Sequence, residues 1–148
     1  MELSPQEWWW VILSTALLPA AALSIRWSGW QATMNACGQW MRVVGVDRRA
    51  HRVDPAALAR MVRIAATYGP FRARCLPQAM IVWTLLRRHG IDAEVKLGVR
   101  RGHRGFEAHA WVELAGFPLD QAIESVPFVP LRRIVINEPL AVSHDAEL

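Results

Sequence analysis

Residues 75–89 read CLPQAMIVWTLLRRH, and they predict a helix that begins at its cysteine. The apolar stripe of this helix consists of residues at helical spacing: Leu76, Ala79, Met80, Trp83 and Leu86. Pro77 falls in the first turn, where no backbone donor is lost, and Arg87 and Arg88 complement the negative end of the helix dipole. Gly90 can close the helix in the left-handed conformation.

After this helix the apolar period changes from 3.6 to 2, which predicts two strands over residues 93–100 and 108–114, joined by a polar turn at 101–105. Ala115 and Gly116 form a short turn, and residues 117–121 return antiparallel to the second strand. Residues 126–136 predict an edge strand in which Pro127 and Pro130 limit pairing. Helices followed by a small antiparallel sheet indicate an α+β domain.

Three further helices precede residue 75. Ser4-Pro5-Gln6-Glu7 is a capping signal for a helix to about residue 24, and Ser28-Gly29 separates it from a helix over 30–44. Asp54-Pro55 repeats the signal for a helix that ends near residue 68, before Gly69-Pro70. We divide the chain into an apolar helical extension, 1–53, and a core, 54–148.

Residues 8–25 contain no charge, and three consecutive tryptophans begin the segment. We expect a helix that packs on the core or docks a partner. Membrane association through 8–25 is the main alternative, since the segment would extend for about 27 Å against a hydrocarbon core of about 30 Å. Secretion is disfavoured because Glu2 and Glu7, and no basic residue, precede the segment. The expected location is therefore the cytoplasm, with the membrane surface left open.

Composition excludes several protein classes. The 148 residues are 53% hydrophobic and include eight tryptophans, so the chain is neither disordered nor fibrous. The formal net charge of +4 comes mostly from arginine, but basic and aromatic residues do not alternate as in single-strand binders, and we expect no nucleic-acid partner. Cys37 and Cys75 are too few for a disulfide framework, and we expect Cys37 to be a small buried hydrophobe.

Cys75 is the candidate nucleophile, because the positive end of a helix dipole favours thiolate. His109 on the second strand is its candidate base. With a two-residue turn at 115–116, Asp120 pairs with Trp111 and lies diagonal to His109, within about 7–8 Å backbone to backbone, whereas Glu113 is about 13 Å along the strand. Asp120 is therefore the better group to orient His109, unless the register changes by one residue.

Each of these residues also has a structural interpretation. A cysteine in an apolar helix is usually core, and a lone histidine on a strand is more often packed than catalytic. A metal site of Cys75, His103, His109 and Asp120 lacks the close paired spacing of zinc ligands, so we expect neither metal nor cofactor. The backbone N–H of Cys75 is a natural oxyanion donor, and Gln78 and Arg74 remain open as the second.

Four motifs occur in a characteristic order: Cys75-Leu-x-x-Ala, then Arg-Arg-His-Gly-Ile at 87–91, Leu-Gly-Val-Arg at 97–100, and Ala-His-Ala-Trp-Val-Glu at 108–113. Together they resemble the transglutaminase-like cysteine peptidases that remove the leader peptide in lasso-peptide biosynthesis. The resemblance covers Asp54 to about Pro130. It implies a papain- or transglutaminase-like core and a triad of Cys75, His109 and Asp120.

The resemblance also implies partners. Such peptidases act on the leader of a precursor peptide, with a small precursor-recognition protein and an ATP-dependent lasso cyclase. The 53 residues before the core do not have the pattern of a fused recognition domain, so we expect the stand-alone type. Acyl transfer by the same triad and a membrane-associated scaffold without catalysis are the alternatives.

Overall fold

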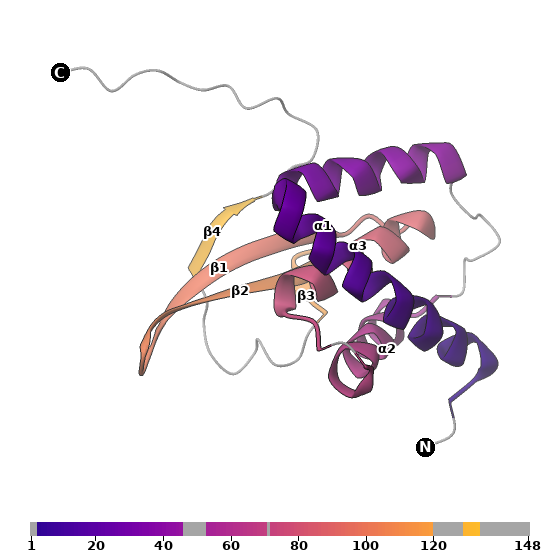
Figure 1. The fold of residues 1–148 in the computed structure, drawn as a ribbon, viewed down its shortest axis with the longest axis horizontal. Helices are drawn as coiled ribbons and strands as arrows, with labels where there is room; N and C mark the ends of the chain where they lie inside the picture. The colour runs from indigo at the N-terminus through magenta and orange to yellow at the C-terminus, as the bar shows by residue number, and fades with distance from the viewer. Residues whose placement is uncertain (1–2, 46–52, 71, 120–128, 134–148) are drawn as a thin grey trace.

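The computed structural model describes residues 3–45, 53–70, 72–119 and 129–133. Its elements are α1 (Pro5–Val44), α2 (Pro55–Tyr68), α3 (Cys75–Arg88), β1 (Glu94–Gly102), β2 (Gly105–Leu114), β3 (Phe117–Pro118) and β4 (Val129–Arg133). The strands form one sheet in the order β3-β2-β1-β4, and every neighbouring pair is antiparallel. Three helices beside a small antiparallel sheet confirm the predicted α+β arrangement (Figure 1).

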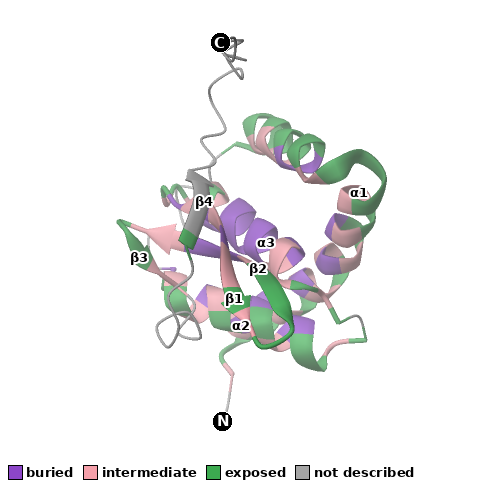
Figure 2. Ribbon diagram, turned by 90° about the vertical axis from the view of Figure 1, so that its left-hand side faces the viewer, coloured by how far each residue is buried: buried purple, intermediate pink, exposed green. Residues whose placement is uncertain are grey.

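Helix α3 is the centre of the core. It contacts α1, α2, β1 and β2, and it is buried over most of its length (Figure 2). Met80, Leu85 and Leu86 are at most 2% exposed, and each such side chain stabilises the fold by about 1.5–3 kcal/mol through burial. The indole N–H of Trp83 donates to the carbonyl of Ala93 at 3.0 Å, which fixes the start of the sheet against this helix.

The predicted break in the N-terminal helix is confirmed as a kink at Gly29, where φ is 80° and ψ is 162°. This conformation is almost restricted to glycine, so the chain turns there and continues as a second helical half. The hydroxyl of Thr33 donates to the carbonyl of Gly29 at 2.9 Å, and the Ser24 hydroxyl lies 2.8 Å from that of Thr33. These bonds hold the two halves of α1 at an angle (Figure 1).

Helix α1 packs on α2 and α3 through buried residues on one side: Trp10, Ser14, Leu18, Ala21, Thr33 and Met34. Among the described residues it is the one helix that has the length and composition to cross a membrane, and 22% of that apolar window is buried in the fold. The division at residue 53 stays a prediction.

Alternation along the strands sorts the side chains as predicted. Val95 pairs with Val112 and Leu97 with Ala110, so these residues share the face that packs on α3. The predicted turn at 101–105 was too long: the strands pair as far as Gly102 and Gly105, and only His103 and Arg104 turn. Arg100 and Glu107 pair within this extension, and the Arg100 guanidinium donates to the Glu107 carboxylate at 2.7 Å.

Candidate active site

Cys75 is the first residue of α3, as predicted, and its side chain is half-buried. The residue before it, Arg74, is extended and makes no capping hydrogen bond with its side chain. The other two helices are capped, by Ser4 and by Asp54. The first N–H groups of a helix have no carbonyl partner within the helix, so the uncapped start of α3 presents donors beside the thiol.

These donors are suited to an oxyanion. The N–H groups of Cys75 and Leu76 belong to the first turn, whereas Pro77 has none. Gln78 is one turn further on, and its amide nitrogen donates to the carbonyl of Ala73 at 2.8 Å. That bond uses one of two amide N–H groups and fixes the backbone before the cysteine. Gln78 therefore serves as a brace for this segment and retains a second donor.

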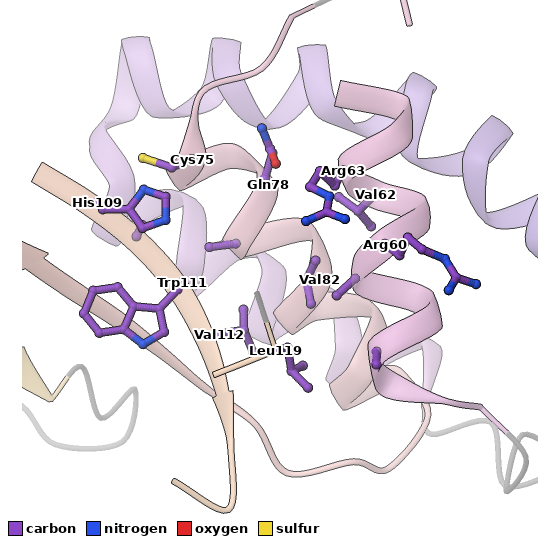
Figure 3. Close-up of a pocket in the computed structure, with 14 residues that line it drawn as sticks. Arg60, Val62, Arg63, Cys75, Gln78, Val82, His109, Trp111, Val112 and Leu119 are labelled. Carbon is purple, nitrogen blue, oxygen red and sulfur yellow. The ribbon is translucent and has the colours of Figure 1, made fainter. Parts of the chain in front are cut away.

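A pocket of about 230 Å³ joins the thiol to the sheet. Its described walls come from α2, α3, β2 and the residue after β3: Ala56, Ala59, Arg60, Val62, Arg63, Cys75, Gln78, Ala79, Val82, His109, Ala110, Trp111, Val112 and Leu119. Cys75 and His109 lie at the same end of it (Figure 3). Gln78 lines the pocket and Arg74 does not, which favours Gln78 as the second oxyanion donor.

His109 is half-buried on β2, where its partner across β1 is Gly98, a residue without a side chain. The His109 and Trp111 rings stack, with centroids 6.3 Å apart and planes inclined by 15°. The indole N–H of Trp111 in turn donates to Glu113 Oε1 at 2.9 Å, and Lys96 Nζ lies 3.7 Å from Glu113 Oε2. A row of packed side chains on one face of β2 thus sets the position of the imidazole.

The predicted register of the 115–116 hairpin is confirmed up to Leu119. Leu114 pairs with Phe117 and Glu113 with Pro118, and the N–H of Leu119 donates to the carbonyl of Val112 at 2.9 Å. Positive φ angles at Ala115 and Gly116 are those of a tight two-residue turn. Asp120 lies outside the described residues, so its place beside His109 stays a prediction.

The pocket residues that were not predicted from the sequence include Arg60, Arg63 and Trp111. The alternation of side chains along β2 was enough to place Trp111 beside His109, because residues two apart in a strand lie on the same face. The arginines had no comparable signal, because only tertiary packing brings α2 opposite the start of α3. Arg60 also donates to Glu7 Oε1 at 3.1 Å, which ties this wall of the pocket to the first turn of α1.

The remaining candidates lie elsewhere. His103 is in the turn between β1 and β2, and His89 is the C-cap of α3. Cys37 is half-buried against the core rather than fully buried, and both cysteines are free thiols. Within the described ranges, no group of three histidine, cysteine, aspartate or glutamate side chains is arranged to hold a metal ion.

Comparison with known proteins identifies the family to which the chain belongs. The sequence model described as the transglutaminase-like superfamily matches residues 16–133. The chain belongs to the transglutaminase-like superfamily. Searches of curated proteins and of solved structures gave no match. Members of this superfamily are typically cysteine-dependent enzymes, which fits a cysteine peptidase or a transglutaminase-type activity. A half-buried thiol at a helix start, with a histidine in the same pocket, agrees with that chemistry.

Proposed function

We propose that this transglutaminase-like protein is a cysteine peptidase that removes the leader peptide from a lasso-peptide precursor. The observation that supports it most is the pocket that Cys75 and His109 share at the uncapped start of α3. The order of the four motifs around these two residues adds the substrate class. In this proposal a separate recognition protein presents the leader, and an ATP-dependent cyclase acts on the freed core peptide.

The reaction begins when His109 accepts the Cys75 proton and the sulfur attacks the scissile carbonyl carbon. The resulting oxyanion accepts hydrogen bonds from the first N–H groups of α3 and from Gln78. The C–N bond then breaks, His109 gives the proton to the leaving amine, and a thioester joins the leader to Cys75. Water activated by His109 hydrolyses this thioester, which releases the leader as a carboxylate and restores the thiol.

Asp120 has the role of orienting His109 in this proposal. Its assignment rests on the strand register and on the resemblance, and the pairing of the hairpin up to Leu119 agrees with that register. A carboxylate at the second ring nitrogen would fix the tautomer and stabilise the imidazolium. We expect Asp120→Asn to leave weak activity, whereas Cys75→Ala and His109→Ala abolish it.

The direct test is cleavage of a cognate precursor peptide, with the recognition protein present and mass spectrometry as the readout. Wild type should release an intact leader, Cys75→Ala should release none, and Cys37→Ala should behave as wild type. Cleavage by Cys75→Ala would overturn the proposal. An added primary amine distinguishes acyl transfer, because a transglutaminase-type enzyme would attach the leader to the amine instead of to water.

Thiol reactivity separates an enzyme from a scaffold. Cys75 and Cys37 are both half-buried, so exposure alone predicts similar alkylation rates for the two. We expect iodoacetamide to modify Cys75 much faster near neutral pH, because His109 lines the same pocket and can accept the thiol proton. His109→Ala should remove most of this difference. Equal, slow modification of both cysteines would contradict catalysis by Cys75.

A further inference from the structure

One face of the first half of α1 is an uninterrupted apolar surface. The outer stripe consists of exposed residues spaced by three or four positions: Trp9, Ile12, Ala16, Ala20, Leu23 and Trp27. Trp9 is 61% exposed, Ile12 59% and Trp27 76%, and the neighbouring Trp8 is 55% exposed. Side chains of this size are normally placed in the core, so a continuous row of them at the surface marks an interaction site.

The opposite face of the same half of α1 is already occupied. Trp10, Ser14, Leu18 and Ala21 are buried against the core that α2 and α3 form. The helix therefore cannot turn its outer stripe inward, and it cannot cross a bilayer without leaving the domain on which it packs. It can lie along a surface, with the core on one side and the outer stripe on the other.

The second half of α1 provides an internal comparison. Beyond the kink at Gly29, the exposed residues include three polar ones, Gln31, Asn35 and Gln39, and four apolar ones, Ala32, Ala36, Trp40 and Val43. The second half therefore exposes apolar residues as well, but they are mixed with polar ones, whereas the outer stripe of the first half contains no polar residue. The purely apolar outer stripe is thus confined to the first half of α1.

The composition of the outer stripe matches a bilayer surface. Tryptophan stands at both of its ends, about 27 Å apart at 1.5 Å per residue, and this residue prefers the headgroup level of a membrane. No charged residue occurs between Glu7 and Arg26, and Arg26 is exposed beside Trp27. Helices that lie in the interface combine such an apolar face with flanking cations that attract anionic lipids.

We propose that the outer stripe binds α1 lengthwise to the headgroup region of an anionic bilayer, which makes the protein a peripheral membrane protein. No described residue of α1 lines the pocket of Cys75 and His109, so the site stays clear when the outer stripe is bound. Figure 3 agrees, because α1 lies behind α3 in that view of the pocket. The proposal is independent of the substrate proposed above.

The test is co-sedimentation of the full chain with phosphatidylcholine vesicles, with and without phosphatidylglycerol. Wild type should bind the anionic vesicles, and Trp9→Ser/Trp27→Ser should weaken binding by about tenfold or more, since two large apolar contacts are lost. Both side chains are exposed, so the fold should persist by circular dichroism. Arg26→Gln should weaken binding to the anionic vesicles only.

The matched control is Tyr68→Ser/Phe106→Ser, which removes two aromatic side chains that are 84% and 82% exposed on α2 and β2. It should bind vesicles as wild type does. Equal binding by the Trp9/Trp27 variant and this control would overturn the proposal, as would a wild type that stays in the supernatant. If that soluble wild type dimerises and the Trp9/Trp27 variant does not, the outer stripe joins two copies and the membrane proposal is wrong.

Discussion

The indole of Trp111 stacks on the imidazole of His109, with the ring centroids 6.3 Å apart. The same indole is anchored by its N–H to Glu113 and is only 6% exposed. A ring that is buried and hydrogen-bonded has little freedom, so it restricts the ring that stacks on it. Trp111 is therefore a positioning residue for the proposed base, and it acts through His109.

Replacing Trp111 should alter the rate more than substrate binding. We expect Trp111→Leu to lower kcat for leader cleavage roughly 10- to 100-fold with little change in KM, because a misplaced base slows proton transfer. Trp111→Phe keeps a stacking ring and should retain more activity than Trp111→Leu. The measurement is steady-state cleavage by each variant, normalised to the folded fraction from circular dichroism.

Glu113→Gln is the control for that series, since its amide oxygen can still accept from the indole N–H. It should leave kcat close to wild type. If Trp111→Leu and Trp111→Phe lose activity only in proportion to their folded fraction, Trp111 has a purely structural role.

The arginines of α2 should influence which peptides are cleaved. The described residues that line the pocket include Arg60 and Arg63, which bring positive charge, and no aspartate or glutamate; Arg60 also pairs with Glu7, which lies outside the lining. We expect peptides with an acidic residue near the cleaved bond to have the lower KM, and Arg63→Gln to reduce this preference by up to about fivefold, as for exposed ion pairs. Steady-state cleavage of paired acidic and amide peptides measures it.

Salt gives a second readout for Arg63, because exposed charges are screened. The preference for acidic peptides should fall as ionic strength rises in wild type and should be nearly salt-independent in the Arg60→Gln/Arg63→Gln double variant. Arg26→Gln, which removes an exposed arginine on α1, should keep the preference. If the double variant still prefers acidic peptides, the arginines of α2 are not the source of that preference.

Local signals in the sequence were sufficient for most of the fold. Capping residues marked the starts of α1 and α2, Gly29 marked the kink, and the change of period marked the passage from α3 to the sheet. The turn between β1 and β2 was misjudged because arginine and glutamate look like loop residues until they pair across strands. The position of Arg60 and Arg63 depends on how helices pack, which no local pattern encodes.

The kink in α1 should be sensitive to a single methyl group. Gly29→Ala places a side chain at φ 80° and ψ 162°, and we expect the free energy of unfolding to fall by about 1–3 kcal/mol. Gly38→Ala is the matched control, since that glycine lies within the second half of α1 with open space around it. It should stabilise the protein by about 0.5–1 kcal/mol. Urea unfolding measures both, and a loss of the same size at the two positions would contradict the assignment of strain to Gly29.

The first turn of α1 should make stability depend on pH. The backbone N–H of Ser4 donates to Glu7 at 2.8 Å and, with the Ser4 hydroxyl and Arg60, holds the pKa of Glu7 below its ordinary 4.5. Because the pKa is lower in the folded state, the ionised carboxylate stabilises the fold above about pH 4.5, and this stabilisation is lost as the pH falls through the folded pKa.

Glu7→Gln removes this titration. The stability gap between wild type and Glu7→Gln in urea unfolding should be full at neutral pH and should shrink below pH 4.5. Carboxyl titration by NMR gives the pKa of Glu7 directly. A difference in stability that does not change with pH would mean that the charge of the Glu7 carboxylate does not stabilise the fold.

Helix α3 is at once the most deeply packed element of the core and the element that begins with Cys75. Substitutions on the two helices that line the pocket should therefore have different consequences. Substitutions along α3 alter folding and reactivity together, so an altered substrate range found there would be hard to separate from a weakened protein. The exposed arginines on α2 face the same pocket from a helix that holds no proposed catalytic group, and they are the natural positions for changing selectivity while leaving the nucleophile untouched.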